Sequence, residues 1–218
     1  MAARIASGKP REPKEGGAPT AAALRPQLRA VRAAMPAAAR AAADVRIADL
    51  LESRIHESLA GGRWGNRRVV LAAFWPIGDE PDLRPALARW SGDARLELAL
   101  PVVSTVAAPL EFRLWTPATD MAPGAYRIPE PQDAPPRTPD IVLVPTLGFT
   151  VDGDRIGYGG GYYDRTLAAL RATGRPLLAL GVSYACGQLP PDVHVPEPHD
   201  MRLDAIVTDA GVVAPSSR

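Results

Sequence analysis

The chain has 218 residues, 46% hydrophobic and 22% charged, which fits one α/β domain with a full-sized core. Its net charge of +1 argues against a nucleic-acid-binding protein, and no apolar run reaches the roughly 20 residues that a membrane-spanning helix needs. The charge is unevenly placed, because 13 of the 25 Lys and Arg but only 6 of the 24 acids precede Val69. A basic region facing a polyanionic ligand explains this asymmetry, and so do solvated Arg-rich helix faces.

The two ends of the chain differ from its body. Residues 1–19 contain three prolines, mixed charge and no apolar periodicity, so we expect a disordered tail there. Residues 214–218 are expected to form a short C-terminal tail, which leaves residues 20–213 as the folded domain. Both lysines of the protein, Lys9 and Lys14, lie in the first tail.

Two helices are expected first, over residues 21–34 and 36–60, because this sequence is rich in Ala, Arg and Leu and Pro36 suits a first helical turn. In the first helix, apolar residues recur at helical spacing and form one stripe: Leu24, Leu28, Val31 and Met35. Three arginines share a neighbouring face: Arg25, Arg29 and Arg32.

The remaining chain alternates apolar strands with helices. Short apolar runs predict buried strands, and an alternating run predicts a half-exposed one at 110–115; the buried runs are 69–75, 96–103, 140–145, 177–182 and 205–208. Helices are predicted over residues 82–90 and 166–174, the second ending at Gly174, and residues 117–139 are a Pro-rich connection. This order predicts a three-layer, single-domain α/β fold with a mostly parallel sheet and helices on both faces.

Cys186 is the only cysteine, so an internal disulfide is impossible and a reducing compartment, the cytoplasm, is expected. It follows an apolar run, which predicts a packed small residue. No neighbouring basic group supports a nucleophilic role.

Residues 155–165, Arg-Ile-Gly-Tyr-Gly-Gly-Gly-Tyr-Tyr-Asp-Arg, are predicted to bind an anion. Glycines let the backbone approach a ligand closely, and N–H groups at the start of a helix attract negative charge. The block lacks the Lys-Ser/Thr of a P-loop and the glycine spacing of a dinucleotide fingerprint. A tight turn alone explains any single glycine, but not the two tyrosines, the Asp and Arg155 beside them.

Four blocks in order resemble the 5-formyltetrahydrofolate cyclo-ligase family, also called methenyltetrahydrofolate synthetase. They are residues 75–80, 110–117, 155–165 and 197–204, and the likeness runs from about residue 21 to 211. The resemblance implies a compact three-layer α/β fold. It also implies an enzyme that uses ATP and Mg²⁺ to close 5-formyltetrahydrofolate to 5,10-methenyltetrahydrofolate, releasing ADP and phosphate.

On the ATP side, the resemblance implies catalytic roles for Arg155 and Tyr163. It places the nucleotide against the following residues: Arg25, Arg155, Gly157, Tyr158, Gly159, Gly160, Gly161, Tyr162 and Tyr163. It assigns Mg²⁺ to Asp164 and Asp200, since Mg²⁺ binds one or two carboxylates with phosphate oxygens and waters. The plainer interpretations are a carboxylate at a helix N-terminus for Asp164 and an Asx-turn for Asp200.

On the folate side, Glu80 stands where the family binds substrate, and a carboxylate there can accept the N–H and amino groups of a reduced pterin. A solvated loop acid is the plainer interpretation. Trp75 and Tyr163 are expected to form apolar walls, with Trp115 as a further possibility, although core packing explains both tryptophans equally well. A monomer with small-molecule substrates is expected, with neither nucleic acid nor membrane as a partner.

One departure from the family pattern concerns the first helix. The family has Lys-x-x-Leu-Arg there, with the lysine on ATP, whereas this chain reads Ala21-Ala-Ala-Leu24-Arg25. Tyr158 also stands where some relatives carry a basic residue. These changes raise an alternative: a catalytically weak relative that binds folate or nucleotide for storage or regulation.

Overall fold

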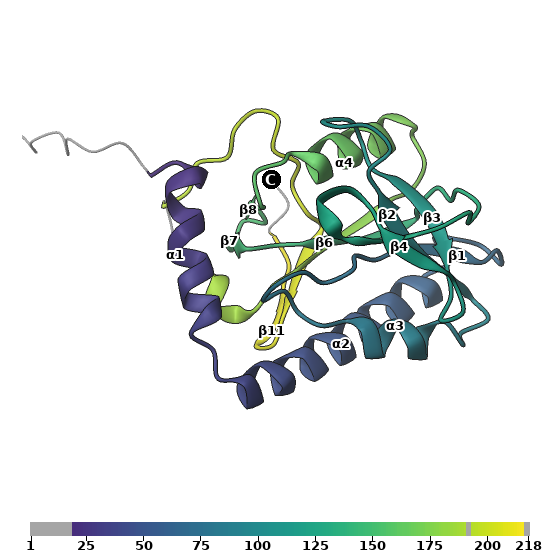
Figure 1. The fold of residues 1–218 in the computed structure, drawn as a ribbon, viewed down its shortest axis with the longest axis horizontal. Coiled ribbons are helices and arrows are strands. Elements are labelled where there is room, and N and C mark those ends of the chain that lie inside the picture. Colours follow the sequence, from purple (N-terminus) through teal and green to yellow (C-terminus); the bar gives the residue numbers. More distant parts are fainter. Residues whose placement is uncertain (1–18, 191–192, 216–218) are drawn as a thin grey trace, which may run out of the picture.

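The computed structural model describes residues 19–190 and 193–215, which form a seven-stranded sheet covered by helices (Figure 1). The two predicted tails lie outside the described residues except at positions 19, 214 and 215. In the described part of the chain, no helix has the length and apolar character needed to cross a bilayer.

The sheet has the strand order β11-β10-β9-β6-β1-β2-β3. The five central strands run parallel, and the edge strands β3 and β11 are antiparallel to their neighbours. The strands have these bounds: β1 Val69–Ala72, β2 Leu96–Val102, β3 Glu111–Trp115, β6 Ile141–Pro145, β9 Leu178–Val182, β10 Ala205–Thr208 and β11 Gly211–Val213. The predicted strands are therefore present, and β11 is an addition.

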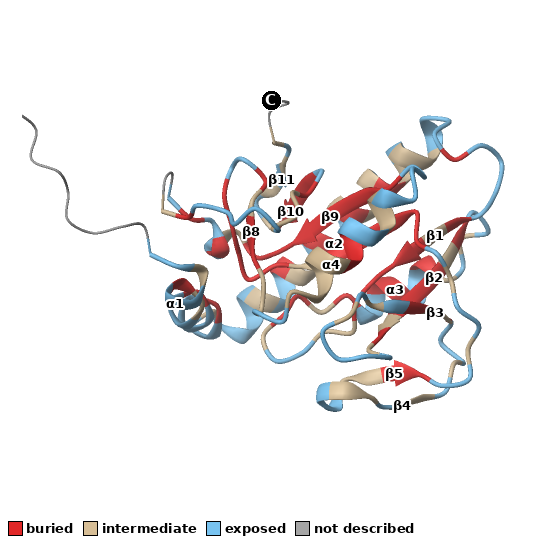
Figure 2. Cartoon of the chain, turned by 90° about the horizontal axis from the view of Figure 1, so that it is seen from above, coloured by how far each residue is buried: buried red, intermediate tan, exposed pale blue. Residues whose placement is uncertain are grey.

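Helices cover both faces of the sheet. Helices α2 (Ala37–Ala60) and α3 (Arg84–Trp90) pack on one face, and α4 (Tyr162–Ala172) packs on the other. The strands between them are almost wholly buried, as Figure 2 shows from above. Near-continuous apolar strands such as Ile-Val-Leu-Val in β6 are typical of a parallel sheet buried on both faces. The predicted three-layer α/β architecture is confirmed.

Helix α1 (Ala21–Ala33) lies beside the sheet instead of on either face (Figure 1). Leu24 and Leu28 anchor it on a small apolar cluster. The predicted apolar stripe is wrong at one position, because Val31 is 48% exposed whereas Arg32 is only 3% exposed. The helix turns Arg32 inward because this side chain has hydrogen-bond acceptors to reach there.

Two predicted boundaries need correction. Helix α4 begins at Tyr162, not at Thr166, so Tyr162, Tyr163 and Asp164 belong to its first turn. The Pro-rich connection contains a hairpin with a short 3₁₀ segment at its tip: β4 Met121–Pro123, η1 Ala125–Arg127 and β5 Pro129–Pro131.

Cys186 is exposed, contrary to the prediction of a packed residue. The reason is that the apolar run ends at Tyr184 and the chain then forms the short 3₁₀ segment η2 (Ala185–Gly187).

The connections place the site at one edge of the sheet. After β1 the chain goes to β2 on one side, and β6 lies on the other side of β1, so the strand order reverses between β1 and β6. In parallel sheets, ligands bind outside the carboxyl ends of the strands at such a reversal. After β6 the chain forms a hairpin of β7 (Gly148–Phe149) and β8 (Arg155–Ile156). This hairpin brings the glycines of residues 157–161 to the same edge of the sheet.

Candidate active site

The glycine loop, residues 157–161, joins β8 to the first turn of α4. Gly161 caps the helix in the left-handed conformation, with φ of 63°, and Gly159 also has a positive φ of 97°. Both conformations disfavour residues with a Cβ atom. No side chain caps α4 among the described residues, so the N–H groups of its first turn are left for an anion at the loop.

Arg25 of α1 holds the loop from the outside. Its Nε donates a hydrogen bond to the carbonyl oxygen of Gly157 at 2.9 Å. A Cβ atom at Gly159 would lie 3.1 Å from the Arg25 guanidinium carbon. The arginine thus packs against Gly159, whose positive φ already disfavours a side chain, and it puts a cation beside the loop backbone.

Asp164 is the centre of a second group of contacts. Its Oδ1 accepts hydrogen bonds from Arg155 Nη2 at 2.7 Å and from the Met201 N–H at 3.0 Å, and Arg155 Nη1 donates to the Met201 carbonyl at 2.6 Å. The Arg155 side chain is 5% exposed. The pair thus ties the segment around Asp200 to the start of α4.

Asp200 lies in a turn, but its Oδ2 accepts the N–H of Glu197, three residues earlier, at 2.8 Å, so the contact is not the Asx-turn of the plainer interpretation. Among the described residues there is no group of three or more His, Cys, Asp or Glu that could hold a metal by itself. Asp164 Oδ2 receives no hydrogen bond from these residues, and its backbone partner Met201 is the neighbour of Asp200. The residue types fit Mg²⁺, which takes one or two carboxylates and completes its shell with phosphate oxygens and waters.

Glu80 is buried, at 6% exposure, and so is not a solvated loop acid. Its Oε2 accepts the Ile77 N–H at 2.9 Å, within the turn that follows β1. Burial raises the pKa of its carboxyl group to about 6, while the Ile77 N–H, the Tyr158 hydroxyl and the charge of Arg32 oppose that rise. At neutral pH the group is a buried anion able to accept hydrogen bonds.

Tyr163 lies in the first turn of α4, next to Asp164. Its phenol pKa is raised, first by burial and then by the negative charge of Glu80, whereas the positive charge of Arg155 lowers it. Both charged groups therefore act on the same hydroxyl, which stays protonated at neutral pH. A protonated phenol can donate or accept a hydrogen bond.

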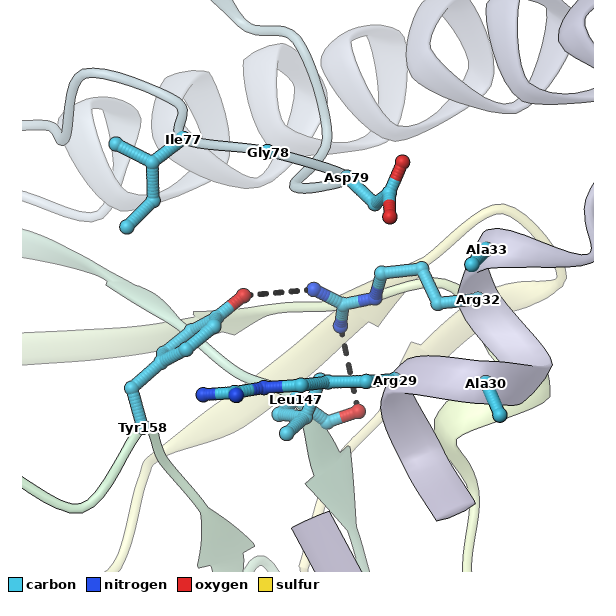
Figure 3. A pocket seen from close by; sticks show the side chains of 9 residues that line it. All are labelled: Arg29, Ala30, Arg32, Ala33, Ile77, Gly78, Asp79, Leu147 and Tyr158. Atoms are coloured by element: carbon cyan, nitrogen blue, oxygen red, sulfur yellow. Dashed lines mark hydrogen bonds between the residues drawn. The ribbon is translucent and has the colours of Figure 1, made fainter. Parts of the chain in front are cut away.

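A cavity of about 460 Å³ lies between α1, the turn after β1 and the glycine loop (Figure 3). In Figure 3, Arg32 and Tyr158 point toward each other across it, and Arg29 lies along the Tyr158 ring. The lining residues are Arg29, Ala30, Arg32, Ala33, Ile77, Gly78, Asp79, Leu147 and Tyr158. Asp79 forms an ion pair with Arg40, so the arginines of α1 make this cavity basic.

Of the predicted site residues, Tyr158 is the one that lines this cavity. Trp75 packs edge to face against Trp115, with ring centroids 6.3 Å apart. Core packing therefore accounts for most of what holds Trp75.

Sequence reasoning missed two residues that touch predicted ones. Arg32 donates to the Tyr158 hydroxyl at 2.8 Å, and its spacing of seven residues from Arg25 was the available signal. Tyr126, at the tip of the β4–β5 hairpin, has its hydroxyl 2.8 Å from that of Tyr162. No sequence pattern pointed to it, because it lies in the Pro-rich connection.

The fold and site together define an α/β protein with a glycine loop at the start of α4 and a buried carboxylate in the turn after β1. Residues 18–209 match the sequence profile of the 5-formyltetrahydrofolate cyclo-ligase family, and the chain belongs to that family.

Relatives agree in sequence and structure. The chain is 32% identical to the 5-formyltetrahydrofolate cyclo-ligase of Mycolicibacterium smegmatis over 169 residues, which cover 72% of this chain and 81% of the relative. It is 30% identical to the Escherichia coli K12 protein of the same name, over 66% and 79% of the two chains. The solved structure of Aquifex aeolicus 5,10-methenyltetrahydrofolate synthetase superimposes with a TM-score of 0.70 at 25% identity, covering 91% of this chain and 94% of that one.

Proposed function

We propose that this protein catalyses the ATP- and Mg²⁺-dependent closure of 5-formyltetrahydrofolate to 5,10-methenyltetrahydrofolate, with release of ADP and phosphate. Membership of the cyclo-ligase family supports the reaction. The observation that carries it in this structure is the uncapped start of α4, where the glycine loop, held by Arg25, leaves backbone N–H groups for phosphates. The buried Glu80 carboxylate follows β1, at the same carboxyl-end edge of the sheet.

The chemistry needs no nucleophile from the protein. The formyl oxygen takes the terminal phosphoryl group of ATP, and ADP is released. N10 of the folate then attacks the formyl carbon, the N10 proton is lost, and the oxygen departs as part of phosphate. Both nucleophiles come from the substrate, so the protein has to position the reactants and offset their charge.

The described residues divide these tasks. The glycine loop offers backbone N–H groups to the phosphates, and Arg25 adds a cation beside the loop. The buried Glu80 carboxylate accepts hydrogen bonds from the N–H groups of the pterin. Tyr163, held neutral, donates a hydrogen bond or packs against the folate between these two ends. The further ATP contacts that the family implies are with Tyr158, Gly160 and Tyr162.

Arg155 acts mainly through Asp164 in this proposal. Its two terminal nitrogens are already hydrogen bonded to Asp164 and to the Met201 carbonyl, so it orients the carboxylate and the loop around Asp200. Asp164 and Asp200 would hold Mg²⁺, which supplies neutralisation of the phosphate charge.

The proposal includes a monomeric enzyme of the cytoplasm that acts on small molecules, not on nucleic acid or membranes. The near-neutral net charge and the single cysteine support this setting.

The direct test is to incubate the purified protein with 5-formyltetrahydrofolate, Mg²⁺ and ATP and to follow the absorbance of methenyltetrahydrofolate. We expect product to form only when all three are present. A protein that binds folate and ATP but makes no product would instead support the alternative of a storage or regulatory module.

Ala21 is the observation that favours this alternative, because the family lysine is missing there. Ala21 begins α1, one turn before Arg25 and partly buried against the Leu24 cluster. A charge-assisted contact to phosphate contributes about 1.5–3 kcal/mol, less repulsion from Arg25. We therefore expect Ala21→Lys to lower the KM for ATP several-fold and to leave the folate KM unchanged. If the KM for ATP is unchanged in Ala21→Lys but higher in Arg29→Gln, then Arg29 already supplies this charge.

A further inference from the structure

The cavity between α1, the turn after β1 and the glycine loop contains two arginines that form no ion pair with the described residues (Figure 3). Arg32 is 3% exposed, and its Nη1 donates to the Tyr158 hydroxyl at 2.8 Å. Its Nη2 donates to two backbone carbonyl oxygens, at 2.7 and 3.3 Å. The guanidinium carbon of Arg29 lies 5.7 Å from the centre of the Tyr158 ring. Two cations therefore converge on one tyrosine, one at its hydroxyl and one at its ring.

The acid in the cavity lining is Asp79, and it is already paired. Its Oδ1 forms an ion pair with Nη1 of Arg40 on α2. Because Arg40 compensates the charge of Asp79, the cavity keeps the positive charge of Arg29 and Arg32. Like charges that converge in a partly buried space are costly without a counter-charge. The cavity is therefore suited to an anion.

The rest of the lining indicates what kind of anion fits. The volume of about 460 Å³ lies within the range of about 300–1,000 Å³ that is typical of sites for small organic molecules. Arginine binds carboxylates and phosphates alike through its planar fork. The lining thus suits an organic molecule that has an apolar or aromatic body and carries oxyanions. The apolar part of the lining comes from Ala30, Ala33, Ile77, Leu147 and the ring of Tyr158.

Two ligands of the proposed function carry oxyanions, ATP and the folate. In that proposal the phosphates of ATP lie at the glycine loop beside Arg25. The cavity, by contrast, adjoins the turn that carries Glu80, because Ile77 lines the cavity and its N–H donates to the Glu80 carboxylate at 2.9 Å. In a folate, an aminobenzoyl ring joins the pterin to a glutamate with two carboxylates. An aromatic body with carboxylates at its end matches this lining better than a triphosphate does.

We propose that this cavity binds the aminobenzoyl-glutamate tail of the folate. Arg29 binds a tail carboxylate, Arg32 adds positive charge from the cavity wall, and the aromatic ring of the tail packs on the apolar lining. The choice of a folate rests on the proposed function, whereas the preference of the cavity for an organic oxyanion does not. The two arginines of α1 are thus specificity-determining residues for a charged tail.

The test compares 5-formyltetrahydrofolate with its diester, in which both tail carboxylates are masked, by calorimetric binding without ATP. The wild-type protein should bind the acid about tenfold more tightly than the diester, because only the acid offers charges to the arginines. Arg29→Gln should weaken binding of the acid by about fivefold and leave binding of the diester unchanged. Arg29 is exposed, so this variant should fold normally.

Asp79→Asn should change binding in the opposite direction. It removes the negative charge from the lining and frees Arg40, so the cavity becomes more positive. We expect the acid to bind several-fold more tightly and the diester to bind as it does to the wild-type protein. Damage to the cavity would instead weaken both ligands.

The matched control is Arg63→Gln. Arg63 is also an exposed arginine that stacks on an aromatic ring, with its guanidinium carbon 5.0 Å from the centre of the Trp64 ring. It donates to the carbonyl of Leu177, just before β9, and so lies at the amino ends of the strands, away from the cavity. Its loss should leave binding of both the acid and the diester unchanged.

Three results overturn the proposal. The first is an Arg29→Gln variant in which the acid and the diester are affected equally or not at all. The second is an Arg29→Gln variant that binds ATP more weakly but the folate normally, which assigns this arginine to the nucleotide. The third is a wild-type protein that binds neither the acid nor the diester. A wild-type protein that binds the acid but makes no product counts against the proposed function alone, since the binding measurement needs no catalysis.

Discussion

At the scale of single residues, Glu80 is a proposed folate-binding residue whose ionised, buried carboxylate lowers the stability of the folded protein. The folded protein binds the Glu80 proton more tightly than the unfolded chain does, because burial raises its pKa from 4.5 to about 6. The stability associated with this proton is fully present below pH 4.5 and is lost as the pH rises through about 6. A shift of this size corresponds to about 2 kcal/mol above pH 7.

We therefore expect Glu80→Gln to stabilise the protein by up to about 2 kcal/mol at pH 8 and to change little at pH 4, while it weakens folate binding. Glutamine can still accept the Ile77 N–H, so the turn is retained. Urea denaturation at the two pH values measures the difference. Glu57→Gln, at an exposed glutamate paired only with Arg54, is the control and should be neutral at both. A glutamine variant that is less stable at pH 8 would show that the ionised carboxylate contributes net stability.

Asp164 combines two roles that substitutions can separate. Its carboxylate offsets the buried charge of Arg155 and also belongs to the proposed Mg²⁺ site. Asparagine keeps an oxygen to accept the hydrogen bonds from Arg155 and Met201 but removes the charge. We expect Asp164→Asn to lose nearly all turnover with a small loss of stability, and Asp164→Ala to lose turnover and, in addition, about 1–3 kcal/mol of stability.

Turnover at several Mg²⁺ concentrations measures the loss of activity, and urea denaturation measures the loss of stability. Asp154→Asn removes the charge of another Asp–Arg pair nearby, with Arg202 at 3.1 Å, and should remain active. Wild-type turnover in Asp164→Asn would exclude Asp164 from the site.

At the scale of elements, the start of α4 shows where sequence reasoning stops. Helices usually begin at a residue whose side chain caps the free N–H groups, but α4 begins after Gly161, whose left-handed conformation makes no side-chain cap. The glycines and Asp164 therefore resembled a longer loop. The β4–β5 hairpin was missed for a similar reason, because strands of three residues rich in proline carry no alternation to detect.

The glycine loop yields a prediction that separates conformation from contact. A Cβ atom at Gly157 would meet nothing within 4 Å, and its φ is not positive, whereas Gly159 has a positive φ and lies against Arg25. We expect Gly159→Ala to lower stability by about 1 kcal/mol and to weaken ATP binding. Gly157→Ala should keep wild-type stability and weaken ATP binding only if the nucleotide needs that space.

Calorimetric binding of ATP and urea denaturation, measured on both variants, decide the matter. Gly62→Ala tests the positive φ alone, because Gly62 also has a positive φ, of 70°, but lies at the end of α2. If Gly159→Ala affects ATP no more than Gly62→Ala does, the loop does not approach the nucleotide.

At the scale of the whole molecule, the fold class followed from the sequence because apolar strands and helices alternate, and this pattern leaves few arrangements. The site followed only in part. The glycine block and Glu80 stand in recognisable motifs, but Arg32 and Tyr126 join the site through contacts between segments more than 30 residues apart. Such pairings depend on how α1 and the hairpin dock, which no local pattern encodes.

The uneven charge found in the sequence has a mixed explanation. Arg25 and Arg32 of α1 turn toward the site, which favours a basic region that faces an anionic ligand. Arg54 and Arg68, by contrast, pair with acids at the surface, as solvated helix and loop residues do. Among these arginines, those of α1 are therefore the ones that relate to the proposed ligand.

Helix α1 should be the least stable part of the described fold, and its stability should respond to nucleotide. It rests on a small apolar cluster that includes Leu24, Leu28 and Leu147, separate from the two larger clusters that join the sheet to α2, α3 and α4. Elements with few buried contacts open locally at low free energy. ATP bound at the glycine loop would hold the loop that Arg25 contacts, so binding and docking of α1 reinforce each other.

Amide hydrogen exchange measures this coupling residue by residue. We expect amides of α1 to exchange faster than those of β6 and β9 in the free protein, and to slow by at least tenfold, ~1.4 kcal/mol, with saturating ATP and Mg²⁺. Arg25→Gln should remove most of that slowing, because it breaks the contact with Gly157 while leaving the apolar cluster intact. Exchange in α1 that is as slow as in β6 without ligand would mean that the helix belongs to the same cooperative unit as the sheet, and that nucleotide binding does not depend on its docking.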